Sequence, residues 1–412
     1  MENSRRRFLA ALPMAGLLRP LERSAQTPMP AADPLGVRAD FPAAHESLYL
    51  DSAYITPTPV PVVDAGRAFV ESKGRRPISL GDMLERTDQV RAAFARLIAA
   101  QPAEIGFLFS TSEGENIVAR ALGLTRGDNV VVDELHYNTS FVLYRHLEQA
   151  TGVQLRIVRA RNGGVTADDF APHVDRRTRM VSVAWVSHQN GFRHEMRPLA
   201  ELAHRFGAWL YADAIQAVGM FPIDVKASGV DIMTTGTYKW LLGSYGVAPF
   251  YVRAELLDRV PPDRMGALHV ERTLPDHRYE IYKTAKKFDY STLAFGSVYQ
   301  LGAALQYLEK VGVARIERHT VGLAHELADG LRSRGFDVLT PAGNRSAIVA
   351  FRNPADAAAT RTLLARERVQ VSLRENGTQM RVSPALFNTE EDIRRFLDVA
   401  EELKARAKVA GE

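Results

Sequence analysis

An aspartate and a lysine 26 residues apart are the two side chains with the clearest capacity for chemistry in this sequence of 412 residues. Asp213 follows an apolar run, and Lys239 is flanked by Tyr238 and Trp240. A lysine amine attacks carbonyl carbons only when it is neutral, and an apolar setting lowers its pKa. A buried Asp–Lys pair is also a common structural ion pair, so these two residues alone do not establish a reactive site.

Other polar residues also follow apolar runs and could bind a ligand. The segment 110–116 has the composition of a helix start, with Ser112 and Glu115 spaced as a capping box. Backbone N–H groups at such a helix N-terminus bind phosphate, although many similar turns are plain caps. His136 and His188 each come shortly after a predicted strand, and Gln216 comes three residues after Asp213.

The segments that must position these residues alternate between apolar strands and amphipathic helices. Continuous apolar strands between helices predict an α/β large domain over residues 34–296, with a mostly parallel sheet covered by helices. Ligands bind beyond the carboxyl ends of the strands in such sheets, which is where the polar residues above lie. The predicted strands are 105–109, 129–132, 153–158, 180–186, 209–211, 232–233 and 247–252, and the helices among them are 84–100, 116–122, 141–150 and 199–206.

The pattern changes after residue 296 and predicts a smaller C-terminal α+β domain over residues 297–412. Helical spacing covers 298–308, 316–334, 358–366 and 391–405, and short strands are predicted at 336–339, 347–351 and 379–383. A small domain of this kind would close against the large one.

Residues 1–33 are predicted to be a signal peptide and linker. Arg5-Arg6-Arg7-Phe8-Leu9 precedes a short apolar stretch, the layout of a secretory signal, and the paired arginines are similar to a twin-arginine export signal. The expected location is therefore the periplasm or the exterior. A disordered basic tail is the alternative, because Arg19 and Arg23 lie late and no clear A-x-A cleavage site follows.

Composition excludes several classes of protein. The chain has no cysteine, so disulfides, thiolate zinc sites and a cysteine nucleophile are excluded. The net charge is +4, of which residues 1–23 carry +3, and a nearly neutral body gives little support for nucleic-acid binding. No apolar run reaches the roughly 18 residues of a membrane span, and no metal site is predicted.

The ordered set of segments resembles the class V aminotransferase family of pyridoxal-phosphate enzymes, fold type I, which includes isopenicillin N epimerases and cysteine desulfurases. The resemblance covers nearly the whole chain after the signal. It is carried by Tyr49–Ala53, Thr111–Gly114, Glu134–Asn138, Asp213–Gly219, Thr237–Gly243, Met380–Pro384 and Asn388–Glu391. It implies a fold type I transferase with pyridoxal 5'-phosphate as cofactor and an amino acid or amine as substrate.

The resemblance also assigns roles to single residues. Lys239 would bind the cofactor covalently, and Asp213 would hold the protonated ring nitrogen. Gln216 or His188 would hydrogen-bond the phenolic oxygen of the ring, although the family commonly has Asn or Thr where His188 stands. His136 would stack on the ring, with Tyr137 as the second candidate.

Phosphate and substrate binding complete the implied site. Thr111, Ser112 and Tyr238 would bind the phosphate, and Ser291 and Thr292 would reach the phosphate of a neighbouring subunit, which implies a homodimer. A lone arginine on a strand is usually a surface charge, but the resemblance implies that Arg381 forks onto the α-carboxylate of the substrate.

The reaction stays open among several alternatives. Transamination or a related α-carbon reaction leads, with C–S lyase or epimerase activity on the same scaffold as alternatives. A desulfurase would need a cysteine near residues 370–380, and the chain has none. A non-catalytic binding protein would have lost Lys239 or Asp213, and a nucleotide-binding protein would need a glycine-rich phosphate loop that the sequence lacks.

Overall fold

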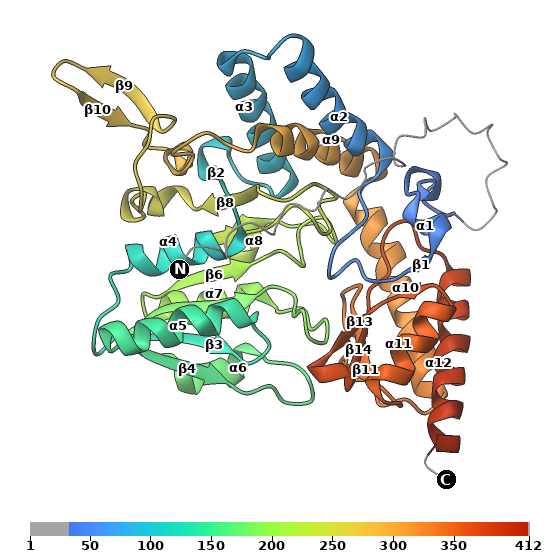
Figure 1. Ribbon diagram of the computed structural model, residues 1–412. Helices are drawn as coiled ribbons and strands as arrows, with labels where there is room; N and C mark the ends of the chain where they lie inside the picture. Colours follow the sequence, from blue (N-terminus) through green and yellow to red (C-terminus); the bar gives the residue numbers. More distant parts are fainter. Residues whose placement is uncertain (1–32, 411–412) are drawn as a thin grey trace, which may run out of the picture.

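The computed structural model describes residues 33–410. It contains a large central sheet with helices on both faces, beside a smaller α+β domain (Figure 1). The seven strands run in the order β2-β8-β7-β6-β5-β3-β4, and only β8 is antiparallel to its neighbours. Their bounds are β2 Ile105–Leu108, β3 Asn129–Asp133, β4 Gln154–Val158, β5 Thr178–Ala184, β6 Trp209–Asp213, β7 Ile232–Thr234 and β8 Ala248–Val252. The predicted fold class is confirmed, and each of the seven predicted strands overlaps an observed one.

Both faces of this sheet are buried, which explains its uninterrupted apolar strands. On β3, Val130 and Val132 join the core on one face, and Val131 joins the core on the other, because side chains alternate along a strand. The first core is covered by α4 (Thr111–Ala121) and α5 (Asn138–Thr151), and the second by α3 (Leu80–Leu97) and α7 (Met196–Arg205).

A helical layer not fully predicted from the sequence lies above the edge of the sheet. Helix α2 (Val60–Arg75), which the sequence analysis left out, packs with α9 (Phe295–Val311), and α9 also packs with α3. The apolar side chains of α9 belong to the core of the large domain. The predicted domain boundary at residue 297 therefore falls inside a helix of that core, and the division into domains stays a prediction.

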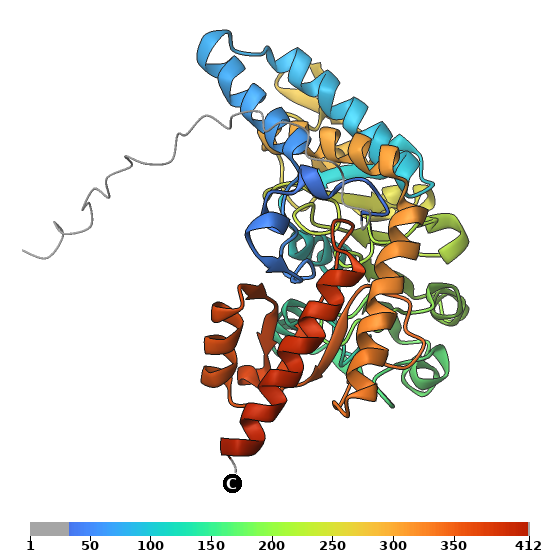
Figure 2. The same cartoon turned by 90° about the vertical axis from the view of Figure 1, so that its right-hand side faces the viewer.

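The small domain is a three-stranded antiparallel sheet covered by helices. The strands run β11-β14-β13, and α10 and α12 lie side by side along them (Figure 2). The N-terminal strand β1 adds to this domain by pairing in parallel with β12. The elements are β1 Leu48–Tyr49, α10 Val313–Ser333, β11 Val349–Arg352, α11 Ala357–Arg366, β12 Val369–Gln370, β13 Ser372–Arg374, β14 Gln379–Val382 and α12 Glu390–Ala410.

The strand predicted at 336–339 is wrong. Val338 forms a single bridge with Phe351, and the N–H groups of Leu339 and Thr340 both donate to the same carbonyl, that of Ala350. The ladder ends there because the next residue, Pro341, has no N–H to donate.

A two-stranded hairpin, β9 (Val270–Leu274) and β10 (Arg278–Ile281), projects from the large domain (Figure 1). The remaining short helices are α1 Ala43–Glu46, α6 Ala167–Phe170 and α8 Val225–Ser228, with 3-10 turns at Arg38–Asp40, Pro102–Glu104, Ala171–His173, Ala254–Arg259, Ala285–Phe288 and Glu375–Gly377. None of the helices within residues 33–410 is long and apolar enough to cross a bilayer. The predicted export signal lies outside the described residues.

Candidate active site

A cavity of about 190 Å³ opens at the carboxyl ends of β5, β6 and β7. The N-terminus of α4 and the loops that follow these strands form its walls, at the edge of the sheet where open α/β folds bind ligands. The structure brings seven of the residues predicted from the sequence together around it: Thr111, Ser112, His188, Asp213, Gln216, Tyr238 and Lys239.

Lys239 follows β7 and is buried, with 8% of its surface exposed. Burial, with the positive charge of Arg381 adding to its effect, lowers the pKa of the amine to about 7. The negative charge of Asp213 opposes the shift without cancelling it. A large share of the amine is therefore neutral near pH 7, which is the form that attacks carbonyl carbons.

Asp213 is the last residue of β6 and lies in the same cavity. Its Oδ1 accepts a hydrogen bond of 3.0 Å from the N–H of Ile215. Burial raises the pKa of this carboxyl, and the neighbouring His136 opposes the shift. A protonated ring nitrogen placed against Asp213 would supply the cationic partner that a buried carboxylate requires.

A glycine lets the loop after Asp213 approach the lysine segment. Gly219 has φ of +94°, and a Cβ there would collide with the backbone oxygen of Trp240, next to Lys239. Only glycine fits both the left-handed backbone and this close contact. The segments that carry Asp213 and Lys239 are thus held together by backbone packing.

The N-terminus of α4 points into the cavity from the opposite wall. Ser110 caps this helix, because its Oγ accepts a hydrogen bond from the N–H of Glu113. The capping box predicted for Ser112 and Glu115 is therefore wrong, since the helix already begins at Thr111 and the Glu115 side chain turns inward. The unpaired N–H groups of the first turn and the helix dipole favour an anion such as phosphate beside Thr111 and Ser112.

Glu115 is a functional candidate that the sequence analysis missed. Its carboxylate lines the cavity and accepts three hydroxyl hydrogen bonds: 2.6 Å from Ser140, 2.7 Å from Ser182 and 2.8 Å from Tyr144. A buried carboxylate is tolerated when hydrogen bonds satisfy it. Because these partners lie 25 to 67 residues away in the chain, spacing gave no signal of the cluster.

His136 is fully buried beside the cavity and does not line it. Its Nδ1 accepts a hydrogen bond of 2.7 Å from the N–H of Tyr137, and its Nε2 lies 3.0 Å from the hydroxyl of Ser182. The hydrogen of Ser182 goes to Glu115, so Nε2 of His136 donates the hydrogen of this second contact. Tyr137 lines the cavity, and the stacking role stays a prediction for either ring.

His188 and Gln216 differ in how free their side chains are. Burial, assisted by the charges of nearby arginines, lowers the pKa of His188 to about 2 and keeps its ring neutral. Its Nδ1 has no hydrogen-bond partner within the described part of the chain. The amide of Gln216 already donates to the carbonyl of Ala53 and accepts from the indole N–H of Trp240, each at 2.8 Å. His188 is thus the freer donor or acceptor for a ligand.

Arg381 lies behind the wall of the cavity, on β14, with 1% of its surface exposed. Its Nη1 donates to the backbone oxygen of His188 at 2.9 Å, and its Nη2 donates to the hydroxyl of Ser372 at 2.9 Å and lies 3.4 Å from the carboxylate of Asp51. Within residues 33–410, its Nε has no partner. The structure connects Arg381 to the site through His188 and places no part of it in the lining.

Ser291 and Thr292 are exposed and lie outside the cavity. They follow Asp289, whose buried carboxylate accepts hydrogen bonds from Arg91 at 2.5 Å and from the N–H of Phe107 at 2.7 Å. This ion pair anchors the segment to the body of the large domain. That the two residues reach a neighbouring subunit stays a prediction.

Aromatic side chains surround the mouth of the cavity, which the sequence analysis did not predict. Phe109, Tyr137 and Tyr245 line it and are exposed, and the rings of Tyr238 and Tyr245 stack with centroids 4.6 Å apart. Exposed aromatic rings gathered at one opening mark a surface that meets a ligand or another protein.

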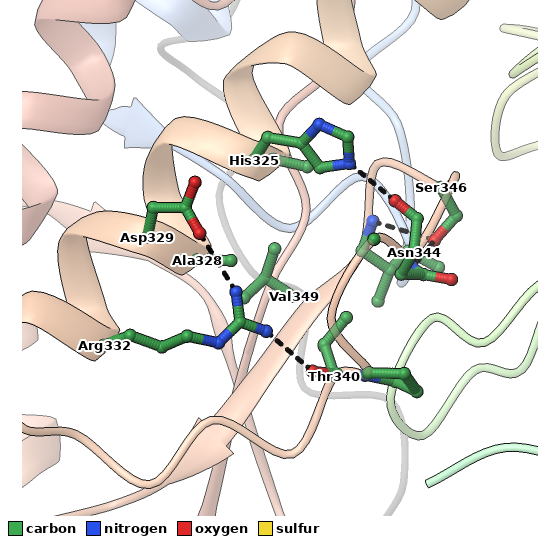
Figure 3. Close-up of a pocket in the computed structure, with 12 residues that line it drawn as sticks. His325, Ala328, Asp329, Arg332, Thr340, Asn344, Ser346 and Val349 are labelled. Atoms are coloured by element: carbon green, nitrogen blue, oxygen red, sulfur yellow. Dashed lines mark hydrogen bonds and ion pairs between the residues drawn. The ribbon is translucent and has the colours of Figure 1, made fainter.

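A second cavity, of about 150 Å³, lies on the small domain between α10 and the segment before β11 (Figure 3). Arg332 is paired with Asp329 and with the carbonyl of Thr340, and His325 bonds to the carbonyl of Asn344. Because its charged groups already bond to one another, this cavity is a weaker candidate than the one at the sheet edge.

Comparisons with known proteins agree with this geometry. A family model described as aminotransferase class-V matches residues 48–396. A probable cysteine desulfurase of Methanothermobacter thermautotrophicus is 30% identical over 390 residues, 89% of this chain and 97% of the relative. An uncharacterized aminotransferase, YcbU, of Bacillus subtilis is 30% identical over 360 residues, 87% of this chain and 95% of the relative.

The fold has a solved counterpart. The apo structure of a cysteine desulfurase from Thermococcus onnurineus superposes with a TM-score of 0.83 at 26% identity. The match covers 90% of this chain and 98% of that structure. Both the large and the small domain therefore follow one known architecture.

Proposed function

Because this chain belongs to the aminotransferase class-V family of pyridoxal-phosphate enzymes, we propose that it acts at the α-carbon of an amino acid or amine, most simply by transamination. The predicted family, cofactor and enzyme class are confirmed at this level. One observation carries the proposal: the buried amine of Lys239 shares a cavity with the carboxylate of Asp213.

The residues present fit pyridoxal phosphate. The N-terminus of α4 with Thr111 and Ser112 suits the phosphate, Asp213 suits the ring nitrogen, and Lys239 suits the covalent link. The unpartnered Nδ1 of His188 leaves that ring able to bond a ligand oxygen. When bound, the cofactor supplies an electron sink for the bonds at the substrate's α-carbon.

The chain's own residues orient the substrate and move its protons. Lys239, whose pKa of about 7 suits both uptake and release of a proton, serves as the general base at the α-carbon. Arg381 orients the α-carboxylate, with Asp51 and Ser372 fixing its guanidinium.

The composition separates this chain from its desulfurase relatives. A desulfurase that carries sulfur on a cysteine needs that residue, and this chain has no cysteine. The segment 371–377, where such a residue is expected, reads VSLRENG. We therefore favour chemistry at the α-carbon, with C–S lyase or epimerase activity as the alternatives on the same site.

Export and dimerisation belong to the same proposal. Arg5, Arg6 and Arg7 with the apolar stretch after them support twin-arginine export to the periplasm or the exterior. The exposed, anchored segment with Ser291 and Thr292 supports a homodimer in which each subunit completes the phosphate site of the other.

The test is spectroscopic and chemical. Purified protein should show the absorption of a bound cofactor, which changes when the right amino acid is added, and products should be assayed as pyridoxamine phosphate, D-enantiomer, or released pyruvate or sulfide. Borohydride reduction and peptide mapping should label Lys239, and Lys239→Ala should lose the label. A label on Lys287, another buried lysine with a lowered pKa, would contradict the assignment.

A further inference from the structure

Arg374 lies on the same face of the small sheet as Arg381. It ends β13, and the antiparallel register pairs Arg374 with Gln379 and Ser372 with Arg381 on β14. Residues two apart on a strand and their directly opposed partners share one face of a sheet. The two arginines are therefore neighbours along that face, with backbones offset by about 7 Å, two residues of strand rise.

This face lies against the loop after β5, whose His188 lines the active-site cavity. Arg381 bonds to the backbone oxygen of His188, and the side-chain amide of Gln379 donates to the backbone oxygen of Gln189 at 2.8 Å. The positive charge of Arg374 adds to burial in lowering the pKa of both His188 and Lys239. The field of Arg374 thus reaches the groups that line the cavity.

Arg374 has no acidic partner within residues 33–410, in contrast to Arg381, which has Asp51. No carboxylate of the described residues lies within 4.0 Å of its guanidinium nitrogens. Cations gathered in a partly desolvated site repel one another, which costs free energy unless an anion joins them.

The turn directly after Arg374 has a backbone conformation that costs free energy. Glu375, Asn376 and Gly377 have φ of +47°, +56° and +90°, three consecutive residues in the left-handed region. Non-glycine residues in that region carry strain that persists where the surroundings determine the conformation, and such strain gathers at ligand sites.

We propose that Arg374 binds a second anionic group, on the side chain of the substrate, so that the enzyme acts on acidic amino acids of the aspartate and glutamate class. The proposal deepens the proposed function and rests on it. Arg381 takes the α-carboxylate, and Arg374, one step along the same face, takes the distal carboxylate. An extended dicarboxylic chain is of the length that this offset requires.

The test measures ligand binding and does not depend on turnover. Glutarate and valerate have the same chain length, and valerate carries a methyl group in place of the second carboxylate. Their dissociation constants for the holoenzyme are read from the change in cofactor absorption. Wild type should prefer glutarate by roughly ten- to a hundred-fold, the range of one charged hydrogen bond.

Variants identify the residue. Arg374→Gln should abolish the preference and leave valerate binding unchanged, Arg374→Lys should retain part of it, and Arg361→Gln, which removes an exposed charge on α11, should keep all of it. A preference that persists in Arg374→Gln, an equal loss for both ligands, or no preference in wild type would each overturn the proposal. If the enzyme turns over amino acids but does not prefer glutarate to valerate, the proposed function stands and the role of Arg374 is wrong. If it prefers glutarate but turns over no amino acid, the role of Arg374 stands and the proposed function is wrong.

Discussion

The guanidinium of Arg381 on β14 donates a 2.9 Å hydrogen bond to the backbone oxygen of His188 on the loop after β5. This bond joins the small domain directly to the wall of the cavity. The position of His188 in the site therefore depends on a strand about 190 residues later in the chain.

Arg381→Ala should raise KM for carboxylate substrates. Loss of a charged hydrogen bond costs about 1.5–3 kcal/mol, roughly a ten- to hundred-fold rise in KM. Steady-state kinetics on the best substrate measure it, with Arg361→Ala as the surface control. An unchanged KM would remove Arg381 from the site.

The uptake of cofactor by the apoprotein should depend on pH around 7. Only the neutral amine of Lys239 reacts, so the reconstitution rate should be low below pH 6 and should level off above pH 8, because the pKa is about 7. Arg381→Gln should move the midpoint upward, since the positive charge of Arg381 is one of the causes of the lowered pKa. A midpoint near the ordinary lysine value, about 10.4, would contradict the buried, neutral amine.

Glu115→Gln should destabilise the protein. The amide cannot accept hydrogen bonds from Ser140, Ser182 and Tyr144 together, so at least one buried hydroxyl loses its partner, at a cost of about 1–3 kcal/mol in the free energy of unfolding. Urea unfolding of the apoprotein measures it. Glu201→Gln, at an exposed carboxylate paired with Arg197, should change stability by less than about 0.5 kcal/mol. Equal stability of the two variants would show that the hydrogen bonds of Glu115 to Ser140, Ser182 and Tyr144 do not stabilise the fold.

Hybrid dimers should recover activity if the active sites are shared. A subunit with Ser291→Ala and Thr292→Ala keeps Lys239, and a Lys239→Ala subunit keeps both hydroxyls. Their hybrid has one complete site, although each parent homodimer has none. Mixed and refolded subunits are assayed, and mass spectrometry confirms the hybrid. Hybrids that form and stay inactive would rule out the shared site.

Replacement of Arg5, Arg6 and Arg7 by lysine should retain the protein in the cytoplasm, because the export receptor reads the arginine pair and not charge alone. Fractionation of cells measures this. Arg19→Lys with Arg23→Lys serves as the matched control and should leave export intact. Export of the triple variant at the wild-type level would refute the twin-arginine assignment.

The strands and most of the site could be predicted because their signals are local. Apolar runs locate β2 to β8, and the residues directly after β6 and β7, such as Asp213 and Lys239, fall at one edge of the sheet by topology. Glu115 could not be predicted, because it acts through hydroxyls brought together only by the fold. Arg381 itself was predicted through the family resemblance, but its partners Asp51 and His188 could not be, because they lie on distant segments.

The strand predicted at 336–339 is the opposite case, a feature that the sequence predicts and the structure does not have. Its apolar residues carry a strand signal, but they are buried or half-buried beside the sheet without extending its ladder, because the hydrogen bonds converge on Ala350 before Pro341. The apolar pattern of a sequence predicts which residues are buried. Whether a buried segment forms a strand depends on the backbone hydrogen-bond partners that it finds in the fold.

The chain passes between the large and the small core several times, and two of these crossings differ in structure. Leu50 belongs to the core of the small domain and Ala53 to that of the large one, and the chain between them enters a turn, in which the N–H of Tyr54 donates to the carbonyl of Asp51. The second is α10, a continuous helix with Ile316 in the large core and Leu323 in the small one.

Asp51 lies at the start of this turn and is the residue that pairs with Arg381. A ligand carboxylate that binds Arg381 competes with Asp51 for the same guanidinium. Ligand binding to Arg381 and the Asp51–Arg381 ion pair are then linked, and each weakens the other by the same free energy. Binding of the substrate carboxylate therefore also releases Asp51, at a point where the chain passes from the small core to the large one.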